Sequence, residues 1–174
     1  MRRREILAAA GSALVSGCGY ALQGRGITTD SSIKRIGVPL FKDRSGKLGL
    51  DTRVTQAVME ELLKRGRFTI VRDITNVDAV VEGEILSWTV APVNFSSDTG
   101  TTQATRYAIS LTANVVYRKV GQKEPLWAND AFSQRDEYDM GESAQNYFDR
   151  EMLSIERLSS AFARNLVAAM LEAF

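Results

Sequence analysis

The amino-acid sequence predicts an α+β domain of two layers, in which two helices cover one face of a mixed, mainly antiparallel sheet of four or five strands. Three observations predict this fold class. The 174-residue chain is 44% hydrophobic and 25% charged, which is the composition of one globular domain. Two stretches repeat apolar residues at helical spacing, and five are β-favouring. Their order along the chain is β-α-β-β-β-β-α.

The first expected strand covers residues 33–41, an apolar and β-rich run with Pro39 near its end. A charged connection leads to a helix that begins with Asp51 as N-cap and ends with Gly66 in the left-handed C′ position. Its apolar residues recur at helical spacing and should form a buried stripe, namely Val54, Ala57, Val58 and Leu62. A short second strand follows at residues 68–71. This strand, helix and strand fit a right-handed parallel crossover.

Three further strands are expected at residues 79–90, 107–117 and 126–134. The first of them contains Gly83, where we expect a bulge or a change of exposure. The second alternates strictly between apolar and more polar residues, as a strand does when one face lies on a core. Residues 92–102 are polar and are expected to form a flexible loop. Because the connections are short, these later strands should be antiparallel meanders.

The second helix is expected at the C-terminus, after an acidic loop at residues 136–141. Its apolar positions recur in steps of three and four and should form a core face, namely Phe148, Met152, Ile155, Ser159, Phe162, Leu166 and Met170. Both helices should then cover the same face of the sheet.

The N-terminal residues have the pattern of a bacterial export signal. A positive cluster at residues 1–4 precedes an apolar run at 6–15 that is too short to span a membrane. The residues that follow resemble the lipobox of bacterial lipoproteins, namely Val15, Ser16, Gly17 and Cys18. We therefore expect a signal peptide at 1–17, a lipidated tether at 18–32 and a single α+β domain at 33–174. General secretion and twin-arginine export both fit this signal.

The composition excludes several kinds of site. The chain has no histidine and one cysteine, so a histidine-based triad, a histidine zinc site and an internal disulfide are all impossible. Removing residues 1–17 takes away three arginines and one glutamate, so the net charge falls from +1 to −1, which does not indicate a nucleic-acid binder. Glu82 and Glu84 share a strand face and are the one pair to consider as acid and base, but a solvated strand face explains them more simply. We expect a non-enzymatic protein with no metal and no cofactor other than a diacylglycerol and a fatty acyl group on Cys18.

Several segments, taken in order, resemble the LptE family of lipopolysaccharide-assembly lipoproteins. They are residues 18–24 (CGYALQG), 33–41, the helix end at 61–68 (ELLKRGRF), 78–85 (DAVVEGEI), 107–117, 125–127 (PLW) and the C-terminal helix. The resemblance covers essentially the whole chain after Cys18. It implies a lipid-anchored protein of the outer membrane that faces the periplasm. It also implies that the chain partners and plugs the large β-barrel LptD, binds lipopolysaccharide and helps to move it to the cell surface.

A phosphorylated lipid ligand would need cations, because charge-assisted bonds from arginine or lysine to phosphate are strong. Arg106, at the start of the alternating strand, is the first candidate for binding lipopolysaccharide. Arg118, Lys119 and Lys123, at its far end, form the second group. For each of these residues, ordinary solubilising charge is the simpler alternative.

A second class of partner is compatible with the same pattern. Lipoproteins that activate cell-wall (peptidoglycan) synthases share the early strand, a helix ending in Arg-Gly-Arg-Phe and a strand that begins with Asp-Ala. They usually carry a longer tether, whereas residues 19–32 reach at most ~50 Å when fully extended. Gly19 also differs from the aspartate that retains lipoproteins at the inner membrane of enteric bacteria. Both features favour the barrel partner. A small-ligand-binding lipoprotein is a third class, and it would require a pocket.

Overall fold

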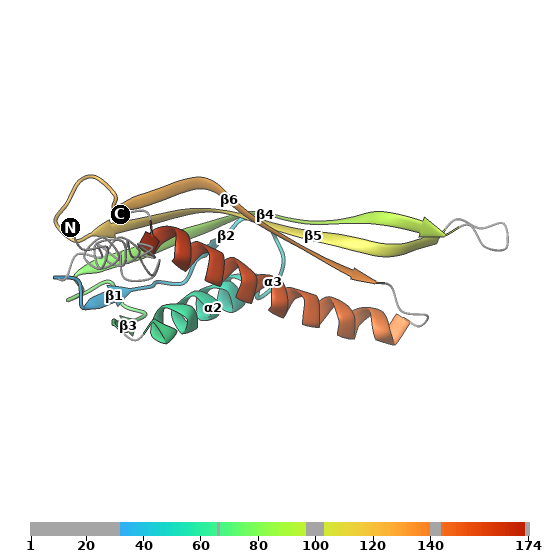
Figure 1. The fold of residues 1–174 in the computed structure, drawn as a ribbon, viewed down its shortest axis with the longest axis horizontal. Helices are drawn as coiled ribbons and strands as arrows, with labels where there is room; N and C mark the ends of the chain where they lie inside the picture. Colours follow the sequence, from blue (N-terminus) through green and yellow to red (C-terminus); the bar gives the residue numbers. More distant parts are fainter. Residues whose placement is uncertain (1–31, 66, 97–102, 140–143, 173–174) are drawn as a thin grey trace, which may run out of the picture.

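The computed structural model describes residues 32–65, 67–96, 103–139 and 144–172, and these form one elongated α+β domain (Figure 1). The elements in chain order are β1 (Arg35–Gly37), β2 (Lys42–Asp43), α2 (Leu50–Lys64), β3 (Thr69–Val71), β4 (Ala79–Ser96), β5 (Gln103–Lys119), β6 (Trp127–Asp139) and α3 (Ala144–Glu172). The expected fold class is confirmed, with one strand more than expected because residues 33–41 supply β1 and β2 begins just after them.

The six strands form one mixed sheet. Its order is β3-β1-β4-β5-β6, and β2 pairs with β4 beside this path. The pairs among β1, β2, β3 and β4 are parallel, whereas β4 with β5 and β5 with β6 are antiparallel. The long strands β4 and β5, of 18 and 17 residues, run side by side along the long axis of the molecule (Figure 1).

The core lies between the sheet and the two helices. The expected stripe of α2 is confirmed, since Val54, Val58 and Leu62 are fully buried. On α3 the stripe is buried from Ile155 onward, and the ring of Phe162 meets that of Phe132 edge-on at 5.3 Å. Met152 does not belong to this core, because it is 58% exposed. Figure 1 shows that α3 continues past α2. The side chain of Phe148 lies outside the described residues.

The step from β3 to β4 is not a meander. Both strands pair in parallel with β1, where Gly37 is opposite Val71 of β3 and Val80 of β4. The connection at residues 72–78 therefore crosses β1. A Cβ atom on Gly37 would lie 2.6 Å from the carbonyl oxygen of Asp73, so this close crossing requires glycine. The later connections, between β4 and β5 and between β5 and β6, join antiparallel strands as expected.

Gly83 has a packing role. A Cβ atom there would lie 2.2 to 2.5 Å from three ring atoms of Phe41, so the absence of a side chain makes room for that buried ring. The expected irregularity of β4 is found just beyond, where the register with β5 shifts between Ile85 and Ser87.

Three boundaries differ from the expected ones. Helix α2 is preceded by Gly49 at φ 74° as its N-cap, and Asp51 is the second helical residue because the buried Leu50 begins the helix. Much of the expected loop at 92–102 is strand, since β4 reaches Ser96 and β5 begins at Gln103. The acidic run at 136–139 is also strand, because it pairs with β5 and arginines balance its carboxylates. Gly66 lies outside the described residues.

No helix in the described ranges has the length and apolar character needed to cross a membrane.

Candidate functional site

The sheet separates the four basic candidates into two groups. Arg106 is opposite Asp139 near one end of β5, and Arg118 is opposite Val80 near the other end. Twelve residues of extended strand place the two arginines roughly 40 Å apart. One small ligand therefore cannot contact both groups at once.

Arg106 is held by two carboxylates of β6. Its Nε lies 2.7 Å from Oδ1 of Asp139, and its Nη1 lies 3.9 Å from Oε2 of Glu137. The hydrogen bond that Arg106 donates to Asp139, followed by the negative charges of Asp139 and Glu137, raises the pKa of Arg106 above its ordinary value. The side chain is 44% exposed, so a ligand can reach the guanidinium, but the ligand would have to compete with two resident carboxylates.

The second group lies where β5 ends, beside the first described residue. Arg118 Nη2 lies 2.5 Å from Oε2 of Glu82, and Lys119 Nζ donates to the hydroxyl of Ser32 at 2.7 Å. Lys123 is exposed in the loop that leads to β6.

Other cations gather at the same end of the molecule. The β1 and β3 strands begin there, because Arg35 pairs with Thr69, and β4 begins beside them with Ala79 opposite Lys119. Figure 1 shows these strand starts and the turn between β5 and β6 at one end of the long axis. We call this surface the basic end, and its cations are Lys34, Arg35, Lys64, Arg65, Arg67, Arg118, Lys119 and Lys123. The sequence did not single out the first five as ligand contacts, because they form two short basic clusters, 34–35 and 64–67, that are far apart along the chain.

The sheet face turned away from the helices carries cross-strand polar pairs. Thr112 donates to Ser133 at 3.3 Å, and Asn114 donates to Asp130 at 3.2 Å. Glu82 and Glu84 belong to this surface, where Arg118 and Arg44 are their respective partners. Each of these two carboxylates is therefore paired with an arginine on a solvent-accessible strand face. The described residues contain no group of three or more carboxylate or cysteine side chains that could hold a metal ion.

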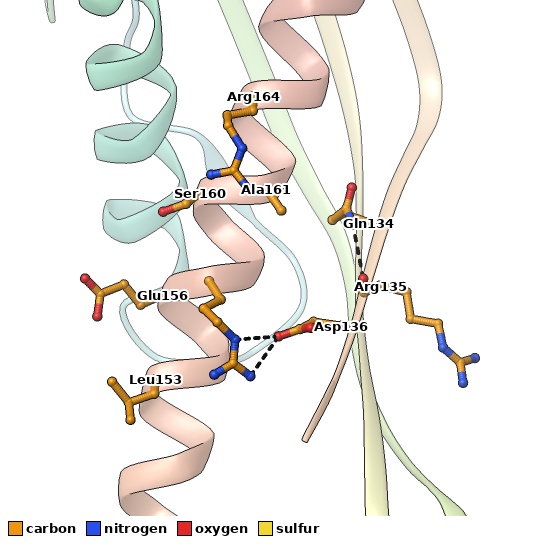
Figure 2. Close-up of a pocket in the computed structure, with 9 residues that line it drawn as sticks. Gln134, Arg135, Asp136, Leu153, Glu156, Ser160, Ala161 and Arg164 are labelled. Atoms are coloured by element: carbon orange, nitrogen blue, oxygen red, sulfur yellow. Dashed lines mark hydrogen bonds and ion pairs between the residues drawn. The ribbon is translucent and has the colours of Figure 1, made fainter. Parts of the chain in front are cut away.

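An open groove of about 520 Å³ lies between β6 and α3 (Figure 2). Arg157 of α3 reaches across it to Asp136 of β6 at 3.1 Å, and Gln134 accepts a hydrogen bond from Asn165 at 2.7 Å. Figure 2 shows Asp136 of β6 joined by dashed lines to a side chain of α3. Because charged and polar side chains bridge this groove from α3 to β6, we assign it no ligand.

Comparison with known proteins identifies the family. The family model described as LptE, lipopolysaccharide-assembly, matches residues 33–170. No curated protein matches the chain by sequence.

Solved structures show the same fold at low sequence identity. Rare lipoprotein B from Shewanella oneidensis has a TM-score of 0.51 at 15% identity, over 80% of this chain and 96% of that chain. A hypothetical protein from Chlamydia trachomatis has a TM-score of 0.51 at 10% identity, over 80% of this chain and 99% of that chain. A minor lipoprotein from Acinetobacter baumannii has a TM-score of 0.50 at 11% identity, over 81% and 92%.

The family match covers nearly every residue that the structure describes, including the whole sheet and both helices except the end of α3. Proteins of this family are non-enzymatic lipoproteins of lipopolysaccharide transport, associated with the outer membrane. The chain belongs to the LptE family of lipopolysaccharide-assembly lipoproteins.

Proposed function

We propose that this protein partners and plugs the β-barrel LptD, and that together they carry lipopolysaccharide to the cell surface. The family match over residues 33–170 is the observation that carries the proposal. The family's role in lipopolysaccharide assembly makes the barrel the first partner to test.

The helix-free face of the sheet supports a place inside a barrel. Its cross-strand pairs, such as Thr112 with Ser133 and Arg118 with Glu82, present polar groups that are already satisfied. The interior of a large outer-membrane barrel is polar and hydrated, so a polar face can lie against it without a desolvation penalty for unpaired groups. An apolar sheet face would not suit that surface.

The proposal includes a lipid anchor. Val15, Ser16, Gly17 and Cys18 form the lipobox, and cleavage after Gly17 leaves Cys18 to carry a diacylglycerol and a fatty acyl group. Residues 18–32 then tether the domain to the periplasmic leaflet of the outer membrane. Two or more buried acyl chains give stable attachment, whereas a single chain gives only marginal attachment.

Direct contact with lipopolysaccharide is the part of the proposal that concerns Arg106, Arg118, Lys119 and Lys123. A ligand phosphate that binds Arg106 must either displace Asp139 and Glu137 or bind beside them. Arg106→Ala should therefore weaken binding of purified lipopolysaccharide, measured by surface plasmon resonance. Arg53→Ala, an exposed arginine on α2, is the matched control. Equal losses in both variants would remove Arg106 as a contact.

Co-purification tests the barrel partnership. Tagged protein extracted from membranes in mild detergent should bring down LptD in a stoichiometric complex, identified by mass spectrometry. Recovery of a cell-wall synthase in place of the barrel would refute the proposal and favour the alternative class of partner. Cys18→Ala should release the protein from the membrane fraction. If this variant stays attached and is processed normally, Cys18 is not the anchor.

A further inference from the structure

The basic end has an excess of positive charge that its own carboxylates do not balance. The four described segments that form it, 34–35, 61–67 without residue 66, 78–82 and 118–124, hold eight lysines and arginines and four carboxylates. Three of these carboxylates are already engaged. Glu61 pairs with Lys64 and Arg65, and Glu82 pairs with Arg118. Asp78 accepts hydrogen bonds from the backbone N–H groups of Lys34 and Arg35 at 2.8 Å each.

Several cations of this end face solvent and make no direct ion pair with a carboxylate of the described residues. Lys34, Arg67 and Lys123 are exposed, and they come from the start of β1, the approach to β3 and the loop before β6. Because three separate segments supply them, they spread over the end of the domain as a surface. Such a surface matches an extended anionic layer better than one compact ion.

Exposed apolar side chains lie among these cations. Val120 is 54% exposed between Lys119 and Lys123, and Leu63 is 52% exposed next to Lys64. Apolar side chains beside cations are typical of surfaces that enter the headgroup region of a bilayer. The end of β6 differs, since its acidic residues Asp136, Glu137 and Asp139 are each paired with an arginine.

The described chain also begins at the basic end. Ser32 is held there by Lys119 Nζ at 2.7 Å. The proposed anchor, Cys18, precedes Ser32 by fourteen residues, a span of at most ~50 Å. The tether thus enters the domain at the basic end, and membrane attachment at Cys18 would keep that surface close to lipid headgroups. A contact that is weak in free solution becomes effectively intramolecular under such tethering.

We infer that the basic end is a second membrane contact, which binds the anionic phospholipid headgroups of the leaflet that holds the anchor. This role for the tether rests on the proposed lipidation of Cys18, but the headgroup contact is a property of the domain alone. The contact orients the long axis of the domain away from the leaflet.

Vesicle co-sedimentation tests the contact without the anchor. The probe protein is residues 18–174 with Cys18→Ala, which keeps the whole core because the buried hydrophobic residues lie between Ile33 and Leu171. Vesicles of phosphatidylcholine with 30 mol% phosphatidylglycerol should bind it at least tenfold more tightly than phosphatidylcholine alone. Raising the salt to 0.5 M should abolish the difference, because screening shortens the range of the attraction.

The decisive variant is Lys34→Gln/Arg67→Gln/Lys123→Gln. Each cation near an anionic surface contributes about fivefold in binding, so this variant should lose at least tenfold. The matched control, Lys42→Gln/Arg53→Gln/Arg164→Gln, removes the same charge from exposed positions elsewhere on the domain and should change binding less than twofold. Unchanged urea midpoints show that both variants fold.

Three outcomes would overturn the inference. Equal losses in the two triple variants would mean that net charge alone is responsible. Equal binding to neutral and anionic vesicles would exclude a headgroup contact. Binding to phosphatidylcholine vesicles that carry lipopolysaccharide, without binding to those that carry phosphatidylglycerol, would make the basic end a lipopolysaccharide site instead. None of these outcomes affects recovery of the barrel by co-purification, so the inference and the proposed function fail separately.

Discussion

Replacing Gly83 with alanine should destabilise the domain through one identifiable clash. The added Cβ atom would lie 2.2 Å from Cε2 and 2.3 Å from Cδ2 of Phe41. Carbon atoms in favourable contact are about 3.5–4.0 Å apart, so the ring must retreat by more than about 1 Å. Phe41 has little room to do so, because it is 1% exposed and its backbone N–H donates to the buried Thr55 hydroxyl at 3.0 Å.

The magnitude follows from these contacts. Overpacking a close-packed core costs about 1–3 kcal/mol, and a rigid ring backed by core residues places Gly83→Ala near the upper end, at roughly 3 kcal/mol. Urea unfolding followed by tryptophan fluorescence measures the loss. The free energy of unfolding should fall by this amount while the dependence on urea concentration stays unchanged, which indicates an altered stability and an unaltered fold.

A double-mutant cycle tests the cause. Phe41→Ala alone should cost about 3–5 kcal/mol, because it leaves a cavity in the core. In that background Gly83→Ala should cost less than about 1 kcal/mol, since the Phe41 ring that clashes with the added Cβ atom is absent. The coupling between the two positions should therefore be about 2 kcal/mol. Simple additivity would refute the reasoning, because the clash would then lie elsewhere.

Three further changes test other parts of the fold. Asp78→Asn should lower the urea midpoint at neutral pH. Hydrogen bonds from the backbone N–H groups of Arg35 and Lys34 lower the pKa of Asp78 below its ordinary value, so the wild-type advantage should be complete above that ordinary value and be lost as the pH falls through the lowered pKa; an advantage that does not change with pH would contradict this account. Gly37→Ala should cost several kcal/mol by the same assay, because the crossing segment leaves 2.6 Å for a Cβ atom, and a neutral effect would mean that this segment moves freely. Phe162→Ala should cost about 3–5 kcal/mol, and a loss below about 1 kcal/mol would show that α3 is not part of the core.

Local patterns were sufficient for most of the secondary structure. Helix α2 carries its buried stripe in consecutive turns, and the strict alternation of β5 follows from one face on the core and one face that is polar. The two antiparallel steps follow from short connections. These features depend on residues close in sequence, so the chain itself determines them.

Boundaries that depend on distant partners were not predictable. The acidic residues at the end of β6 predict a loop from the sequence alone. They lie in a strand because Arg106 of β5 and Arg157 of α3 balance their charge. The crossing of β1 by residues 72–78 depends on a glycine 35 or more positions away in the chain, whose role appears only when the strands are assembled. Met152 follows the helical stripe in the sequence, but the assembled domain leaves it 58% exposed.

The same division holds for function. The sequence by itself determined the lipobox at Cys18, the absence of histidine chemistry and the family resemblance, because each of these is a property of residue identity and order. Only the tertiary structure decided that Arg106 lies far from Arg118, and that cations from three segments meet at the end where Ser32 lies. Sheet register and strand order bring such residues together, and neither can be read from the spacing of charges along the chain.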